Sequence, residues 1–143
     1  MSLKFRDAEE DDAEELAGIA NEFVLRDSIS IESMRDLIHD RRIIVAEETQ
    51  SVEIVGYVNY EVHGTDVIVH HIAVVPDRRR EGIGTDLIEY PIQFADSEGL
   101  RTRVIVEKED DSTRSFLGSL GFEHGDTRFF DGRKMTVFER DPR

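Results

Sequence analysis

One stretch of the chain, residues 74–85, has the sequence VVPDRRREGIGT and carries its strongest structural signal. The apolar run VIVHHIAVV at 67–75 predicts a strand that ends at Pro76. A helix is expected to begin at about Ile83, after the basic, glycine-containing loop. The first amide groups of a helix have no partner within it, and they point outward at the positive end of its dipole. The stretch therefore predicts a strand–loop–helix unit whose loop exposes unpaired amides.

The loop combines these amides with positive charge and little side-chain bulk. Gly82 and Gly84 lack the Cβ atoms that would keep an anion away from the backbone. Three consecutive arginines, Arg78–Arg80, add positive charge, although Arg78 is expected simply to be exposed. We predict that the loop binds a multivalent phosphate, the alternative being an ordinary strand–helix turn with solvated arginines. Spacing excludes two other phosphate loops, because no Gly-Lys pair exists and Leu87 stands where a dinucleotide loop needs glycine.

Outward from this loop, apolar periodicity predicts elements along the whole chain. The expected strands are 3–6, 43–47, 52–62, 67–75 and 102–107, followed by a terminal hairpin of 127–130 and 134–139. The expected helices follow a capping box at Asp11 and Glu14, an N-cap at Ser30, the loop at Ile83 and an N-cap at Ser112. The second helix is expected to bury Ile31, Met34, Leu37 and Ile38 on one face. Pro91 lies inside the third helix and is expected to kink or interrupt it. This order indicates an α/β (α+β) fold with a mixed sheet and flanking helices.

Length and charge fit a single folded domain over residues 1–143. The chain has 32 acidic and 18 basic residues, which gives a formal net charge of −14. Such a surface either attracts a cationic substrate or stays solvated at high salt, and the even spread of the acids favours the second alternative. Duplex nucleic acid is not expected as a partner of so acidic a surface.

The remaining composition bears on location and on metal chemistry. No run approaches the roughly 18 apolar residues of a membrane span, and the first residues do not form a signal peptide. We therefore expect a cytoplasmic protein without a membrane partner. Cysteine is absent, and His39, His63 and His124 show no metal-ligand spacing, so no metal site is expected.

Three segments together resemble the GNAT (GCN5-related N-acetyltransferase) superfamily. Residues 79–84, RREGIG, match its motif [QR]-x-x-G-x-[GA], and HIAVVP at 71–76 is similar to the strand end that precedes that motif. Residues 115–122, SFLGSLGF, resemble the family's later helix that ends in L-G-F, and FRDA at 5–8 is similar to the family's opening segment. The resemblance covers essentially the whole chain.

The resemblance implies a mostly antiparallel sheet that splays between the strands at 67–75 and 102–107, with acetyl-CoA wedged in the gap. Main-chain groups of Ile72–Val74 would pair with the pantetheine arm, and amides from Arg80 to Thr85 would hold the pyrophosphate. Asp110 stands where the family often has an asparagine. The residues implied to bind acetyl-CoA are Ile72, Ala73, Val74, Arg79, Arg80, Glu81, Gly82, Ile83, Gly84, Thr85 and Asp110.

The reaction implied by the resemblance is acetyl transfer to a primary amine of a small molecule or protein. The amine attacks the thioester directly, without a covalent enzyme intermediate. Such a transfer needs a base for the ammonium group and an acid for the leaving thiolate. Leu117 stands at the position of the family's acid tyrosine, and Ile105 at that of a glutamate found in some relatives.

His70, His71 and Glu107 are the candidate catalytic groups. Some relatives use a histidine on this strand as the base, and His70 lies at such a position; imidazole titrates near neutrality. Neighbours on a strand point to opposite faces, so His70 and His71 cannot both face one site. Each candidate has an alternative, because a histidine can be structural and Glu107 can end a solvated strand. Tyr57 and Tyr60 either line the acceptor pocket or pack in the core.

The sequence leaves the activity, the acceptor and the assembly open. Leu117 favours, as an alternative, a catalytically silent module that binds acyl-CoA. A third alternative is a structural α/β domain whose arginine loop binds nothing. Homodimers are common among such folds, but the sequence does not establish whether this chain forms one.

Overall fold

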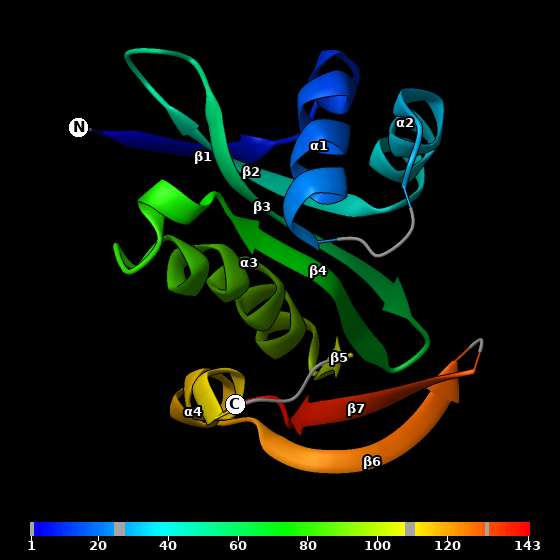
Figure 1. Cartoon of the computed structure of the whole chain (residues 1–143). Coiled ribbons are helices and arrows are strands. Elements are labelled where there is room, and N and C mark those ends of the chain that lie inside the picture. Colours follow the sequence, from blue (N-terminus) through cyan, green and yellow to red (C-terminus); the bar gives the residue numbers. More distant parts are fainter. Residues whose placement is uncertain (1, 25–27, 108–110, 131) are drawn as a thin grey trace. The chain divides into compact units, whose positions relative to one another are not determined.

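The computed structural model describes residues 2–24, 28–107, 111–130 and 132–143. Its strands are β1 (Leu3–Asp7), β2 (Arg42–Glu48), β3 (Ile54–His63), β4 (Asp66–Val74), β5 (Arg101–Val106), β6 (Glu123–Phe130) and β7 (Arg133–Arg140) (Figure 1). Its helices are α1 (Ala13–Ile19), α2 (Ile31–Asp40), α3 (Ile83–Glu98) and α4 (Asp111–Ser119), with the 3₁₀ turns η1 (Glu10–Asp12) and η3 (Pro76–Arg78) and the π-helix η2 (Ala20–Val24). No helix of the described residues is long and apolar enough to cross a membrane.

Within the described residues, seven strands form one sheet in the order β1-β2-β3-β4-β5-β7-β6. Among the strand pairs whose register is described, β4–β5 is parallel and the others are antiparallel. A mixed, mostly antiparallel sheet with flanking helices confirms the predicted α+β fold.

The chain forms two compact units, and each is described by itself. The N-terminal unit contains residues 1–61 and 71–90, and the C-terminal unit contains residues 62–70 and 91–143. Strands β3 and β4 and helix α3 contribute residues to both units. Helix α3 continues through Pro91, so the expected interruption is wrong, but the unit boundary falls directly before this proline.

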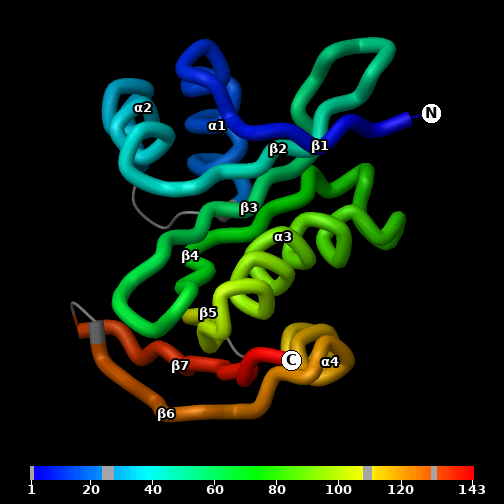
Figure 2. Tube along the Cα trace, turned by 180° about the vertical axis from the view of Figure 1, so that it is seen from behind, coloured from blue at the N-terminus to red at the C-terminus, as the bar shows by residue number. Residues whose placement is uncertain are grey.

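In the N-terminal unit, α1 and α2 lie side by side next to the strands (Figure 1; Figure 2). Together with one face of β2, β3 and β4 they bury an apolar cluster. Its members are Ala13, Leu16, Ala17, Ile19, Ala20, Met34, Ile43, Val45, Ile54, Tyr57 and Ala73. Strand β2 joins this core to β1 through a register that runs from Leu3–Glu48 to Asp7–Ile44.

The two helix starts in this unit differ in how well the sequence predicts them. Ser30 caps α2 as expected, because its Oγ accepts a hydrogen bond from the Ser33 amide at 3.0 Å. The capping box lies earlier than Asp11 and Glu14, since the chain enters α1 through η1 and the Glu9 amide donates to Asp12 Oδ2 at 2.7 Å.

The expected apolar face of α2 is only partly correct. Met34 is 2% exposed, and Leu37 and Ile38 pack against the cluster. Ile31 is the first residue of α2, one turn before Met34, and it stays 40% exposed. The core therefore begins at the second turn of this helix.

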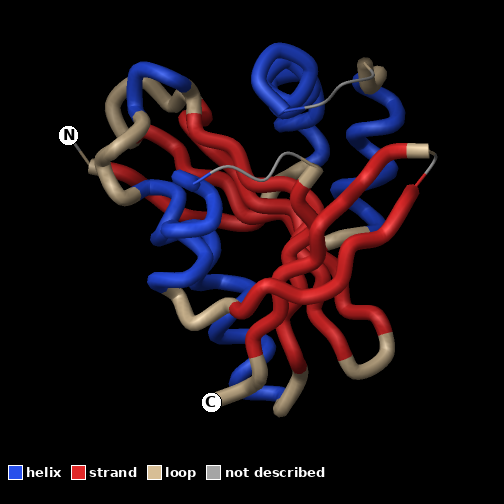
Figure 3. Tube along the Cα trace, turned by 60° about the horizontal axis from the view of Figure 1, so that its bottom comes forward, coloured by secondary structure: helices blue, strands red, loops and turns tan. Residues whose placement is uncertain are grey.

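In the C-terminal unit, the first half of β4 pairs with β5 in a register from Asp66–Arg101 to Val69–Val104. This registered pairing stops there, although β5 continues to Val106. Strand β5 then pairs with β7, which forms a long hairpin with β6 (Figure 3).

Helix α4 begins two residues earlier than predicted, because an N-cap at Ser112 would place the first helical residue at position 113. Because it starts at Asp111, Ser112 lies within the helix and is not its N-cap. Gly121 has φ 89° at the end of the helix, and the Phe122 amide donates to Leu117 O at 3.1 Å. A glycine in this left-handed conformation is the usual way to satisfy the last carbonyl groups of a helix.

Candidate functional site

The loop between β4 and α3 belongs to the N-terminal unit and passes through two positive φ angles. The Val75 amide donates to Val55 O at 2.9 Å, so the loop leaves a strand that is still paired. Arg80 then has φ 67° and Gly82 has φ 83°. Glycine adopts this conformation freely, whereas an arginine adopts it at a cost of about 1–2 kcal/mol. A non-glycine residue held in this region commonly marks a functional site.

Helix α3 is anchored to the strands immediately behind the loop. Ile83 is 2% exposed, and Leu87 and Ile88 are fully buried. A Cβ atom on Gly56 of β3 would lie 3.2 Å from Leu87 Cδ1 and 2.7 Å from Ala73 O. Glycine at this position therefore lets β3, β4 and α3 approach closely, which fixes the helix start relative to the end of β4.

The start of α3 presents backbone amides without a helical partner. The first intrahelical hydrogen bond runs from Asp86 N to Gly82 O at 3.0 Å, so the amides of Ile83, Gly84 and Thr85 have no acceptor one turn earlier. A Cβ atom on Gly82 would meet nothing within 4 Å, and Gly82 itself is exposed. The space beside Gly82 therefore leaves these amides open to approach by an anion.

The three arginines of the loop have different surroundings. Arg78 was expected to be exposed, but its side chain is only 12% exposed because it pairs with Glu48 and Glu81. Hydrogen bonding to Glu48, and then to Glu81, raises the pKa of Arg78. Arg79 is exposed and its Nε donates to Val74 O at 3.0 Å, while Arg80 is exposed at the tip of the loop. The positive charge offered to a ligand is thus that of Arg79 and Arg80.

Buried polar groups lie on the α1–α2 face of the same unit. Tyr57 and Asn59 are each 1% exposed, and the Tyr57 hydroxyl and Asn59 Oδ1 have no hydrogen-bond partner. Burial raises the pKa of Tyr57, so its hydroxyl keeps its proton. Alternation along β4 places His71 on the face of Ala73, which packs in the same cluster as Tyr57. His70 lies on the opposite face of the strand.

The structure groups only some of the predicted site residues. The N-terminal unit contains His71, Ile72–Val74 and the loop from Arg79 to Thr85. The C-terminal unit contains His70 and Glu107. Asp110 lies outside the described residues. Leu117, at the position of the family's acid tyrosine, is 2% exposed. Among the described residues, no three His, Asp or Glu side chains are grouped as metal ligands.

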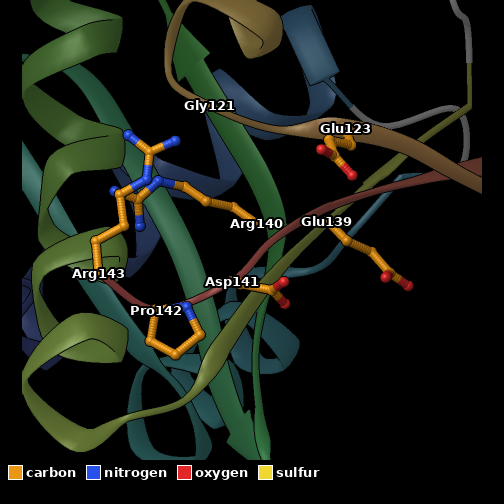
Figure 4. Close-up of a pocket in the computed structure, with 7 residues that line it drawn as sticks. All are labelled: Gly121, Glu123, Glu139, Arg140, Asp141, Pro142 and Arg143. Atoms are coloured by element: carbon orange, nitrogen blue, oxygen red, sulfur yellow. The ribbon is translucent and has the colours of Figure 1, made fainter.

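A hollow of about 260 Å³ opens in the C-terminal unit (Figure 4). It is lined by Gly121, Glu123, Glu139, Arg140, Asp141, Pro142 and Arg143. Arg140 and Arg143 lie together on one side of it and Glu123 and Glu139 on the other (Figure 4). Glu139 is paired with Arg101 and Arg103, and Arg140 with Asp96, so much of this charge is already compensated within the fold.

The sequence profile of the Acetyltransferase (GNAT) family matches residues 4–122, and the chain belongs to this family. Acetyl-CoA is the acetyl donor of the family. No functionally curated protein matches the chain in sequence.

Solved structures share the fold at low sequence identity. Ard1 from Thermoplasma volcanium has a TM-score of 0.82 at 18% identity, with 99% of each chain covered. The PaiA N-acetyltransferase from Thermoplasma acidophilum, in complex with coenzyme A, has a TM-score of 0.80 at 18% identity, again with 99% of each chain covered. The ribosomal-protein-S18-alanine N-acetyltransferase from Escherichia coli has a TM-score of 0.80 at 18% identity, with 98% of this chain and 94% of the other covered.

Sequence patterns missed the partners of Arg78 and the buried side chain of Asn59 on β3. Glu48 lies on β2, 30 residues before Arg78 in the turn η3, so no local spacing links the two. Asn59 stands in an apolar strand, VNYEV at 58–62, and this polar interruption was the available signal. A polar residue inside a run that is otherwise buried calls for a hydrogen-bond partner.

Proposed function

We propose that this protein transfers the acetyl group of acetyl-CoA to a primary amine of a small molecule or protein. The loop between β4 and α3 carries the proposal. It combines three amides without a helical partner, the open approach at Gly82 and the charges of Arg79 and Arg80. These groups suit a pyrophosphate, which needs several donors and a positive field at once.

Binding divides between the loop and the strand that leads into it. In this proposal the amides of Ile83, Gly84 and Thr85, with Arg79 and Arg80, hold the pyrophosphate. The main chain of Ile72–Val74 pairs with the pantetheine arm. On binding a phosphate, Arg79 would exchange the hydrogen bond from its Nε to Val74 O for a charge-assisted one. The Val74 carbonyl would then be available to the pantetheine amide.

The chemical step proposed is direct attack by the amine. The nitrogen must lose a proton before it forms the C–N bond, the C–S bond of the thioester breaks, and the thiolate takes up a proton. His70, His71 and Glu107 are the proposed groups for the first proton transfer. The alternation along β4 favours testing both histidines, because they face opposite sides of the strand.

One observation favours a second candidate function, a silent module that binds acyl-CoA. Leu117 replaces the tyrosine that protonates the thiolate in many relatives, and its side chain is buried in the C-terminal unit. A water molecule or another residue would then have to donate this proton. Without such a donor the protein would bind acetyl-CoA and turn it over slowly.

Calorimetry with acetyl-CoA, followed by an acceptor screen at low and at molar salt, tests these alternatives. Binding with turnover of one amine class supports the proposed transferase. Tight binding with no thioester loss for any amine in a broad panel supports the silent module. Absence of acetyl-CoA binding at both salt concentrations would overturn both proposals.

A further inference from the structure

Arg78 holds two carboxylates at once, one from the sheet and one from the loop itself. Its Nη1 donates to Oε2 of Glu48 at the end of β2, and its Nε donates to both oxygens of Glu81, at 3.2 and 3.1 Å. We call these three residues the charge bridge. The side chains of Arg78 and Glu48 are 12% and 9% exposed, so salt screens their pairing little. The planar guanidinium, held by two acids, has a single orientation.

The charge bridge spans the most constrained part of the loop. Arg78 precedes Arg80, whose φ is 67°, and Glu81 follows it. The far end of the bridge is itself held in place, because the amide of Glu48 donates to Glu53 O at 2.8 Å. A non-glycine residue keeps a positive φ only where its surroundings over-determine it. The charge bridge supplies such a constraint on both sides of Arg80.

The charge of Glu81 adds an electrostatic reason for the bridge. Glu81 directly precedes Gly82, and its side chain is 46% exposed. An uncompensated carboxylate at this place would repel a phosphate held by the neighbouring amides. The ion pair with Arg78 compensates this carboxylate, while Arg79 and Arg80 keep their charge for a ligand.

We propose that Arg78 is a positioning residue for acetyl-CoA. It acts through the charge bridge, by holding Arg80–Gly82 in the conformation that presents the amides and by compensating Glu81. This inference rests on the proposed function, in which the loop holds the pyrophosphate. Arg78 itself touches carboxylates of the protein and is not assigned a contact with the ligand.

The affinity for coenzyme A and the steady-state kinetics test the proposal. Arg78→Met removes both ion pairs, and we expect the Kd of coenzyme A and the KM for acetyl-CoA to rise roughly tenfold, with kcat changed less than about twofold. Adding Glu81→Gln to Arg78→Met should restore part of the affinity, because the repelling carboxylate is gone. A merely structural role for Arg78 predicts no such recovery. Glu48→Gln keeps the side-chain shape and should also raise the Kd of coenzyme A. It provides a second variant if Arg78→Met does not fold.

Arg6 of β1 offers a matched control, because one of its partners, Glu47, is next to Glu48 on β2. Arg6 also holds two carboxylates, Asp12 at 2.8 Å and Glu47 at 2.7 Å, and its side chain is 20% exposed. Arg6→Met should lower the melting temperature but leave the Kd of coenzyme A unchanged. Equal losses of affinity in Arg6→Met and Arg78→Met would show a general effect on stability and would overturn the proposal.

A ligand-free measurement separates this inference from the proposed function. Backbone ¹⁵N order parameters for residues 79–84 should fall in Arg78→Met and stay unchanged in Arg6→Met. If the wild-type protein binds no coenzyme A, the proposed function fails, yet the order parameters still test the positioning of the loop. Unchanged order parameters in Arg78→Met would overturn the role of Arg78 whatever the protein binds.

Discussion

The backbone oxygen of Ala73 lies 2.7 Å from the place where a Cβ atom on Gly56 would stand. The same Cβ would be 3.2 Å from Leu87 Cδ1. Non-bonded carbon atoms normally keep about 3.5–4.0 Å between them. The absence of a side chain at Gly56 therefore allows β4 and the start of α3 to pack closely against β3. The loop that connects β4 to α3 is held at both ends by this contact.

Replacing Gly56 with alanine should destabilise the N-terminal unit. The new methyl group meets backbone, so β4 must shift, and we expect the free energy of unfolding to fall by about 1–3 kcal/mol. Denaturant titration measures this change. Gly118→Ala is the control, because Gly118 is helical and a Cβ there meets nothing within 4 Å; it should raise stability by up to about 1 kcal/mol. Equal changes in the two variants would contradict the close approach.

Replacing Gly82 with alanine should weaken coenzyme A binding. Gly82 has φ 83° and precedes the amides at the start of α3, so alanine adds both backbone strain and a methyl group where the pyrophosphate is proposed to lie. We expect the Kd from calorimetry to rise about tenfold or more. Gly64→Ala carries comparable strain, at φ 64° in the β3–β4 turn, without a proposed ligand contact. An unchanged Kd in Gly82→Ala, or the same rise in both variants, would remove the loop from the binding site.

The elements that the sequence predicts correctly are those whose ends are set by residues a few positions away in the sequence. Ser30 lies three residues from the amide that it caps, and Pro76 follows the end of β4 as expected. The loop was predictable for the same reason, because its glycines, arginines and flanking elements are contiguous.

The features of the fold and the candidate site that the sequence did not predict depend on contacts between segments far apart in the sequence. Arg78 was expected to be exposed because no local pattern shows that Glu48, on β2, compensates its charge. The close approach of β4 and α3 to Gly56 likewise follows from the packing of α3. The sequence of β3 by itself shows only a glycine in an apolar run. Catalytic groups are the least predictable, since they need the placement of several strands at once.

Replacing His70 with alanine should lower turnover in a pH-dependent way. If His70 accepts the proton of the ammonium group, its loss matters most at low pH and least at high pH, where the amine is already neutral. The profile of kcat/KM against pH measures this effect. His71→Ala is the matched variant, because the two imidazoles lie on opposite faces of β4. If His71→Ala alone changes the profile, His71 is the base; if neither variant changes it, both histidines are excluded.

Acid should weaken the N-terminal unit through Asp12. The hydrogen bond from Arg6 is the main cause that holds the pKa of Asp12 below its usual 3.8, and the Glu9 amide adds to it. Because the folded pKa is the lower one, the stabilisation is complete above about pH 4 and is lost as the pH falls through the folded pKa. Arg6→Met should remove most of this dependence, so its free energy of unfolding should fall less steeply below pH 4 than that of the wild type. Denaturant titrations at pH 6, 4, 3.5 and 3 measure both curves. Parallel curves would show that the ion pair between Arg6 and Asp12 contributes nothing to acid sensitivity.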